Sequence, residues 1–332
     1  LRPYSFFDIG NLHAYDDEDN NAKILNKIAD KCYLPVNRIL LDLINEYRGD
    51  FRIAFSLTGV ILEQLERYRP DALESFKRLA ATGCVEFLGE TYYHSLAFLF
   101  SPREFTEQVH LQEKKIRELF GQKPLTFRYT ELIYSNELAK LAEDLGYQVI
   151  LAEGADKILA GLSPNFLYRP AGLKKMKLLL KNYRLSDDIA FRFSNPRWSE
   201  YPLLADKFAH WLHQIKARDG VINLFMDYET FGEHQWQETG ILEFLKVLPR
   251  EITRNRDFRF LTPAEAAKSH EPAAALDVPA LTSWADTERD LSAWLGNTMQ
   301  KDASRTLYDM EAACRSKKDK ALLHTWRKLQ TS

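Results

Sequence analysis

Short apolar runs rich in β-branched and aromatic residues alternate with longer segments of helical periodicity along most of the chain. The runs that predict strands occupy residues 51–56, 85–88, 125–129, 148–152, 178–181 and 221–226, with a weaker one at 258–261. Helical periodicity covers residues 60–82, 102–120, 135–145, 202–218 and 239–248. Four glycines are expected to stop helices just before the next strand, namely Gly83, Gly121, Gly146 and Gly220. This alternation predicts an α/β protein with a parallel sheet or barrel.

The pattern changes after Thr262. An Ala- and Pro-rich connector, EPAAALDVPAL, begins at Glu271 and leads into residues 284–332, which are charged and helical in period. We therefore expect a barrel over residues 1–270 and a helical region over residues 271–332 that packs on it. The opening segment through Asn20 is expected to form a long loop. Its acidic run at residues 16–20 predicts a solvated surface or the start of a helix.

Charge and cysteine usage narrow the class of protein. Lys+Arg 45 against Asp+Glu 47 give a net charge of -2, so neither nucleic acid nor an anionic membrane is expected as a partner. The cysteines form no C-x-x-C pair, which argues against a disulfide framework and a structural zinc site. No run of about 18 apolar residues and no charged-then-apolar leader is present, so we expect a cytoplasmic protein. The pattern indicates no oligomeric state.

Two carboxylates directly follow predicted strands. Glu131 comes after the strand at 125–129, and Asp227 comes after the strand at 221–226. In a parallel barrel the carboxyl ends of the strands meet at one mouth, where catalytic side chains gather. A pair of carboxylates there suits glycosidic bond cleavage. The alternative is that each caps or begins the helix that follows its strand.

Longer motifs around these carboxylates carry a family resemblance. The segment MDYETFGEHQW resembles the fourth signature region of glycoside hydrolase family 57, and RYTELIYSN resembles the third. The segment GCVEFLGETYYHSL is similar to the second region, in which Glu86 takes the place of a glutamate that lines the site. The resemblance implies that Glu131 is the nucleophile and Asp227 the general acid/base.

The resemblance also implies a fold and an activity. The fold is an incomplete (β/α)7 barrel followed by a helical region that helps to close the site. The activity is retaining cleavage of α-1,4-linked glucan, amylase-like, with no metal or cofactor in the chemistry. A 4-α-glucanotransferase or a branching enzyme on the same scaffold is the alternative. One departure stands out: the His-Gln-Pro of the first signature is missing, so we expect the first strand of the barrel to be missing from this chain.

Further residues in and near the motifs are expected to contact the sugar, some by hydrogen bonds and the aromatic ones by stacking. The fifth signature region is poorly matched, and TSWADTERDLSAWLGN is its counterpart here. The alternative for each tryptophan is packing in the core. The expected substrate-binding residues are Glu86, His94, Arg128, Glu229, His234, Trp236, Trp198, Trp284 and Trp294.

Two other functions compete with the hydrolase. A metal-dependent carbohydrate deacetylase needs an Asp and two His as ligands. The sequence has no H-x-x-x-H pair, and His210 and His213 fit an amphipathic helix, so no metal site is expected. A glucan-binding protein without turnover is disfavoured by the presence of both carboxylates.

Overall fold

A computed structural model of the chain describes Phe6, residues 16–215 and residues 220–332. The strands are β1 (Ile53–Phe55), β2 (Val85–Phe87), β3 (Thr126–Phe127), β4 (Val149–Glu153), β5 (Tyr168–Pro170), β6 (Lys177–Lys181), β7 (Phe231–Gly232), β8 (Gln235–Trp236) and β9 (Ala274–Leu276). The α-helices are α1 (Glu18–Ile28), α2 (Leu34–Glu46), α3 (Gly59–Tyr68), α4 (Pro70–Ala81), α5 (Pro102–Phe120), α6 (Asn136–Asp144), α7 (Asp156–Leu159), α8 (Tyr183–Asp187), α9 (Ala205–His213), α10 (Ile241–Thr253), α11 (Pro263–Ser269), α12 (Ser292–Leu295), α13 (Thr298–Asp309), α14 (Glu311–Ser316) and α15 (Lys320–Lys328).

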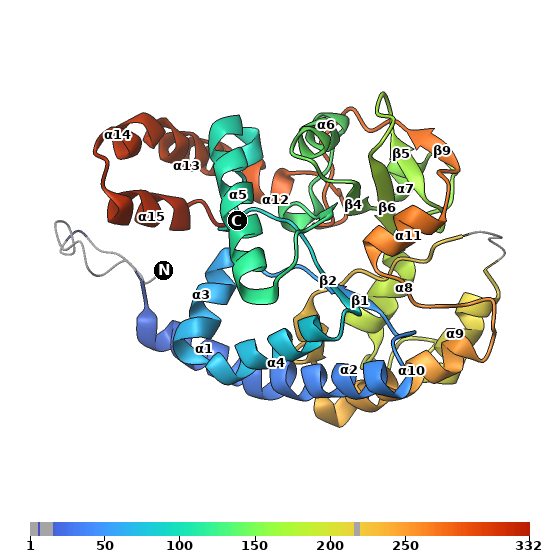
Figure 1. The fold of residues 1–332 in the computed structure, drawn as a ribbon. Coiled ribbons are helices and arrows are strands. Elements are labelled where there is room, and N and C mark those ends of the chain that lie inside the picture. The colour runs from blue at the N-terminus through green and yellow to red at the C-terminus, as the bar shows by residue number, and fades with distance from the viewer. Residues whose placement is uncertain (1–5, 7–15, 216–219) are drawn as a thin grey trace.

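A run of parallel strands forms the centre of this α/β fold (Figure 1). β1 pairs with β2, and β4 lies between β3 and β6, all in parallel. A parallel bridge between Gly89 and Phe127 joins the end of β2 to β3. Among the described residues, β1 pairs with β2 only. The carboxyl ends of β1, β2, β3, β4 and β6 therefore lie along one edge, as the alternating pattern predicted for a parallel sheet.

Residues 221–226 are not a strand, contrary to the prediction from their apolar run. They pair with β6 only through a parallel bridge between Lys181 and Asn223. Next to this bridge, side chains replace the backbone partners of a regular strand pair. Asn223 Nδ2 donates to the Leu180 carbonyl, and Ser186 Oγ accepts from Phe225 N. The segment still runs parallel to β6 at its carboxyl end.

Residues 258–261 are not a strand either, because they pair with no strand of the described chain, and Phe258 N donates instead to the Asn255 carbonyl in a turn at 3.0 Å. Phe260 contacts Phe51, with ring centroids 4.9 Å apart. The predicted helix at 60–82 is two helices, α3 and α4, because Pro70 starts a new helix and Arg69 before it has non-helical backbone angles, φ -140° and ψ 62°. The predicted helix at 202–218 is shorter: α9 ends at His213, so Gly220 does not terminate it.

The helix α1 has Asp17 as its N-cap. The acidic run is thus a helix start, and the long loop predicted through Asn20 ends earlier, while residues 1–5 and 7–15 lie outside the described part. After Glu271, β9 pairs with β5 in the same sheet as β3, β4 and β6. The helices α13, α14 and α15 then form a group beside α5 (Figure 1). The boundary near Glu271 stays a prediction.

The segment 227–236 packs against a π-helical turn at Ala29–Tyr33, between α1 and α2. Cys32 Sγ donates to the Tyr228 carbonyl, and Tyr33 OH donates to Glu229 Oε1 at 2.6 Å. Gly232 has φ 117°, and a Cβ at this position would overlap the carbonyl oxygen of Lys31. This close approach requires glycine.

We predict that Gly232→Ala destabilises the protein more than Gly240→Ala does. Both positions have positive φ, but a Cβ at Gly240 meets no atom within 4 Å. Left-handed strain costs each variant about 1–2 kcal/mol, and overlap with Lys31 should add about 1–3 kcal/mol at Gly232. Denaturant unfolding measures both changes, and equal losses in free energy of unfolding would show that the close approach does not matter.

Candidate active site

Polar side chains end or follow each strand of the parallel run. Ser56 follows β1, Glu90 lies just beyond β2, Glu131 lies just beyond β3, and Glu153 and Lys181 are the last residues of β4 and β6. Because these strands are parallel, their polar residues gather at one edge. Some of the predicted residues, His94, Arg128 and Trp284, meet Glu131 here together with residues that were not predicted.

The carboxylate of Glu131 is held from two sides. His94 Nε2 donates to Oε1 at 3.0 Å, and Trp284 Nε1 donates to Oε2 at 2.9 Å. The backbone of Trp284 also donates to the Glu131 carbonyl, at 3.2 Å. The side chain of Glu131 nevertheless keeps 25% of its surface exposed. A fixed orientation and an open face are what an attacking carboxylate needs.

His94 links Glu131 to a buried second carboxylate. Its Nδ1 lies 2.5 Å from Glu90 Oε1, while its Nε2 bonds Glu131. Both ring nitrogens therefore face carboxylates, and an imidazole donates from both only when it is protonated. Burial alone would lower the pKa of His94, but the two carboxylates outweigh it and raise the pKa to about 9.

Glu90 is almost completely buried and is balanced by several donors. Ser56 Oγ donates to its Oε2 at 2.5 Å, and Arg128 Nη1 lies 3.6 Å from its Oε1. Burial would raise the pKa of Glu90, yet the charges of His94 and Arg128 lower it. For Glu131, burial also acts to raise the pKa, but the hydrogen bonds from His94 and Trp284 outweigh it and lower the pKa to about 2. Glu131 is thus a carboxylate at every physiological pH.

Three positively charged side chains position Trp284. Lys181 Nζ lies 5.2 Å from the centre of the Trp284 ring, and the Arg128 guanidinium lies 5.0 Å from it. Arg289 donates to the Trp284 carbonyl and to Glu153 Oε2, the latter at 3.2 Å. Cation–π contacts and this backbone anchor hold the indole that bonds Glu131.

Backbone strain is concentrated at the same place. Among the described residues, the non-glycine positions with positive φ in or next to this network are His94, Glu131, Leu132, Asp286 and Arg289. Glu131 itself has φ 57° and ψ 25°. Such conformations cost of order 1–3 kcal/mol each and persist where the surroundings fix them. At this turn the backbone leaves the direction of β3, and Glu131 comes within hydrogen-bond distance of His94 and Trp284.

Asp227 lies in a different setting from Glu131. It precedes the short turn Tyr228–Thr230, and its exposed side chain makes no hydrogen bond or ion pair with the described residues. It follows Asn223, which pairs with Lys181 at the carboxyl end of β6. Asp227 thus follows a segment that runs beside the end of β6 without being a strand, and its pairing with Glu131 stays a prediction.

The other residues of the Asp227 motif face the helical side of the fold or solvent. Glu229 accepts from Tyr33, while the rings of His234 and Trp236 are exposed, Trp236 by 60%. Lys31 Nζ lies 5.4 Å from the centre of the Trp236 ring. None of these three contacts Glu131 or His94 by a hydrogen bond or ion pair within the described chain.

Three further candidates make contacts that explain them as structural residues. Glu86 is buried and its Oε2 accepts from Ala264 N at 2.9 Å, at the start of α11, and burial raises its pKa. Trp198 packs edge-on against Trp211, and Trp294 packs against the apolar cluster around α5 and α6. Their assignment to substrate binding stays a prediction.

Glu153 and Lys181 were not predicted as site residues. The sequence nonetheless indicated them, because each is the last residue of an apolar strand, VILAE and KLLLK. Glu131 and Asp227 follow apolar runs in a similar way. Glu90 and Arg289 lie in the segments GCVEFLGETYYHSL and TSWADTERDLSAWLGN, so the family resemblance was the signal that pointed to both. Within the described ranges, no group of three or more His, Cys, Asp or Glu is arranged to hold a metal ion.

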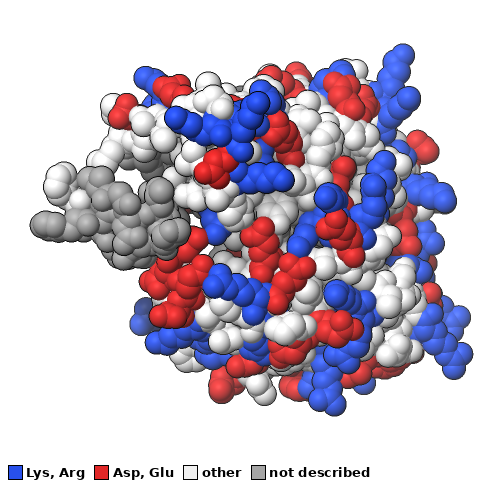
Figure 2. Space-filling model, turned by 60° about the vertical axis from the view of Figure 1, so that its left-hand side comes forward, with Lys and Arg blue, Asp and Glu red and all other residues white. Residues whose placement is uncertain are grey.

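Two properties of the surface bear on partners. On the face shown in Figure 2, Lys and Arg side chains are interspersed with Asp and Glu over its described part. In the portion of the chain that is described, no helix has both the length and the apolar character needed to cross a membrane.

Comparison with solved structures finds proteins of similar fold. The chain superposes on the 4-alpha-glucanotransferase of Thermococcus litoralis with a TM-score of 0.67 at 19% identity, covering 90% of this chain and 45% of that one. It superposes on a GH57-type branching enzyme of Pyrococcus horikoshii with a TM-score of 0.68 at 15% identity, covering 93% and 81%. At these identities the likeness concerns the fold.

Sequence relatives are closer. A protein of Methanocaldococcus jannaschii named "Putative alpha-amylase" is 49% identical over 300 residues, which cover 89% of this chain and 63% of that protein. Alpha-amylase 1 of Dictyoglomus thermophilum is 24% identical over 262 residues, which cover 74% and 36%. The chain spans less than two thirds of the length of these relatives. The family model for glycosyl hydrolase family 57 matches residues 6–279, and this chain therefore belongs to that family.

Proposed function

We propose that this chain carries the catalytic centre of a retaining glycoside hydrolase that cleaves α-1,4-linked glucan, with Glu131 as nucleophile and Asp227 as general acid/base. The observation that carries the proposal is the Glu131 carboxylate, which is ionised, fixed by two donors and still open on one side. The relatives named as alpha-amylases support the choice of substrate. We further propose that the parallel strands belong to an incomplete (β/α)7 barrel.

The proposed reaction has two steps. Glu131 attacks the anomeric carbon while Asp227 donates a proton to the departing glycosidic oxygen, which leaves a glycosyl ester on Glu131. Asp227 then takes a proton from water, and the resulting attack on the anomeric carbon releases Glu131 and the sugar with its configuration retained. This sequence requires the two carboxyl groups to lie about 5–5.5 Å apart around the substrate.

The surroundings of each carboxylate suit these different tasks. His94 and Trp284 each use one oxygen of Glu131, and each oxygen keeps a further lone pair for attack. The same donors stabilise the carboxylate when it leaves in the second step. Asp227 has no competing partner among the described residues, so its carboxyl is free to exchange protons with the leaving oxygen and with water.

Exposed side chains in the same motif as Asp227 are the proposed sugar contacts. Trp236 offers an open indole face on which a glucose ring can stack, and the His234 ring is exposed next to it in the same motif. In the network around Glu131, Arg128 adds positive charge near Glu90 and Trp284. Transfer to a sugar hydroxyl in place of water would make the same site a glucanotransferase or branching enzyme, and the products distinguish these outcomes.

We predict that Glu131→Gln in the full-length protein abolishes turnover of maltooligosaccharides, because an amide cannot form the ester. Asp227→Asn should reduce kcat by about 10²–10⁴-fold, the usual contribution of general acid/base catalysis. Chromatography of the products follows both variants. Glu137→Gln is the control, since Glu137 is an exposed glutamate in the first turn of α6 with no role in the proposed site, and it should keep far more activity than either.

Full activity of Glu131→Gln or Asp227→Asn would exclude the corresponding role. Binding of maltooligosaccharides without turnover by the unaltered protein would instead favour a glucan-binding protein that lacks catalysis. Release of acetate from an acetylated glucan would favour the deacetylase. Chain-length redistribution without net release of reducing ends would identify transfer as the main reaction.

We predict that the stabilisation supplied by His94 depends on pH. The folded-state pKa of about 9 lies above the ordinary value of about 6.5, so the protonated ring stabilises the fold fully below pH 6.5. This contribution is lost as pH rises through 9. The difference in free energy of unfolding between the parent and His94→Gln should therefore shrink by up to about 3 kcal/mol between pH 6 and pH 10.

Denaturant titrations at several pH values measure this difference. His234→Gln is the control, because that ring is exposed and makes no hydrogen bond with the described residues. Its difference from the parent should stay constant over the same range. A constant difference for His94→Gln as well would mean that His94 is not held between two carboxylates.

A further inference from the structure

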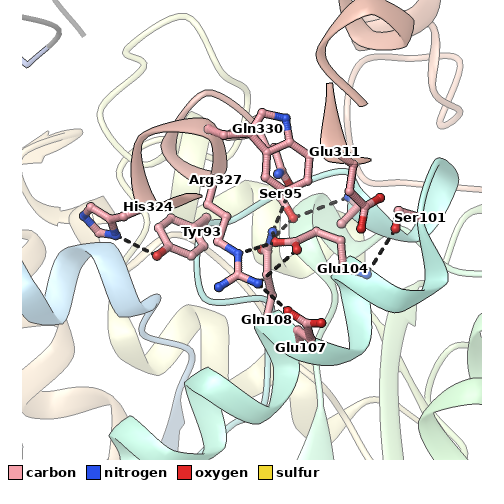
Figure 3. Close-up of polar contacts among 12 residues, drawn as sticks. Tyr93, Ser95, Ser101, Glu104, Glu107, Gln108, Glu311, His324, Arg327 and Gln330 are labelled. Atoms are coloured by element: carbon pink, nitrogen blue, oxygen red, sulfur yellow. Dashed lines mark hydrogen bonds and ion pairs between the residues drawn. The ribbon is translucent and has the colours of Figure 1, made fainter. Parts of the chain in front are cut away.

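A buried ion-pair cluster fastens the C-terminal helices to α5 (Figure 3). Glu104 on α5 is completely buried, and Arg327 on α15 donates to it from Nε at 2.7 Å and from Nη2 at 3.0 Å. Arg315 on α14 pairs with Glu104 and, at 2.8 Å, with Glu107. Two arginines from the helical region thus converge on two glutamates of one helix.

Gln108, one turn further along α5, connects this cluster to the loop that carries His94. Its side-chain nitrogen donates to Glu104 Oε1 and to Gln330 Oε1, both at 2.8 Å. Its oxygen accepts from Ser95 Oγ at 2.8 Å. Gln108 and Ser95 are fully buried, so water does not compete for these bonds.

The residues that follow α15 contact the same loop directly. Thr331 pairs with Ser95 in an antiparallel bridge, and Ser332 N donates to the His94 carbonyl at 3.0 Å. Thr331 Oγ1 donates to the Tyr93 carbonyl at 3.0 Å. The backbone on both sides of His94 is therefore tied to the C-terminal segment.

We propose that the Glu104–Arg327 ion pair, acting through Gln108 and Ser95, is a positioning device that holds His94 between Glu90 and Glu131. His94 has φ 50°, a conformation that costs a non-glycine residue about 1–2 kcal/mol and that its own loop does not favour. Docking of α15 supplies the contacts that maintain it. The inference rests on the proposed role of Glu131, because it explains how the hydrogen bond to that carboxylate is kept.

The test compares two substitutions in the full chain. Arg327→Met alone would leave the buried Glu104 with less compensation, which destabilises a fold strongly. The double variant Glu104→Gln/Arg327→Met removes both charges and leaves Arg315 paired with Glu107 and Glu311. Arg103→Met is the control, because Arg103 pairs with Glu107 on α5 and does not contact α15.

The readout is the pKa of His94, followed by NMR of the labelled imidazole and assigned with His94→Gln. The groups that face this ring are Glu90, Glu131 and Arg128. In the double variant we expect the pKa of His94 to fall by at least one unit from about 9 toward 6.5, because the ring leaves one or both carboxylates. In Arg103→Met it should not change.

Ser95→Ala provides a second, milder variant, since it removes the link from Gln108 to the loop and, besides it, the longer bond that Ser95 Oγ accepts from Ala97 N at 3.4 Å. It should lower the pKa of His94 in the same direction and should decide the matter if the double variant does not fold. An unchanged pKa in every folded variant would overturn the proposal. If the unaltered protein is active, kcat should fall in these variants while KM changes little. If the unaltered protein has no α-glucan turnover, the proposed function is refuted, and the NMR result alone then tests the positioning of His94.

Discussion

The site depends on the interaction of the His94 ring, protonated at both nitrogens, with the carboxylates of Glu90 and Glu131. His94 donates to Glu131 through Nε2 and faces Glu90 through Nδ1, so one positive charge serves two acids. Without it, Glu90 and Glu131 would repel each other across a partly buried space, and the hydrogen bonds that keep Glu131 ionised would be reduced to that of Trp284. The hydrogen bond from Ser56 and the positive charge of Arg128 reduce the free-energy cost of burying the Glu90 carboxylate.

This interaction has to be assembled from distant parts of the chain. Glu90 and Glu131 come from neighbouring parallel segments, whereas Trp284 follows the last strand and is anchored through Arg289 to Glu153. The segment that follows α15 binds the loop that carries His94. Positive φ values at the joints are the cost of bringing these groups to one carboxylate, and the buried ion pairs around them fix a single arrangement.

The strand pattern predicted a parallel α/β fold and Glu131 at a strand end, because both follow from local periodicity and from the polarity of the next residues. It failed where tertiary contacts replace local rules. Residues 221–226 have a strand-like sequence, but side chains of Asn223 and Ser186 take their backbone hydrogen bonds. The contact of Glu86 with α11 joins residues 178 positions apart, which no local pattern indicates. Tryptophans are equally ambiguous, since an indole in a motif packs on the core as readily as on a sugar.

The account holds that Glu131 becomes covalently bonded to the sugar. The most direct measurement is mass spectrometry of proteolytic fragments after reaction with an activated, fluorinated α-glucosyl donor, whose glycosyl ester hydrolyses slowly. The predicted result is one glycosyl group on the fragment that contains Glu131, absent in Glu131→Gln. A glycosyl group on another carboxylate, or products of inverted configuration with no labelled fragment, would contradict it.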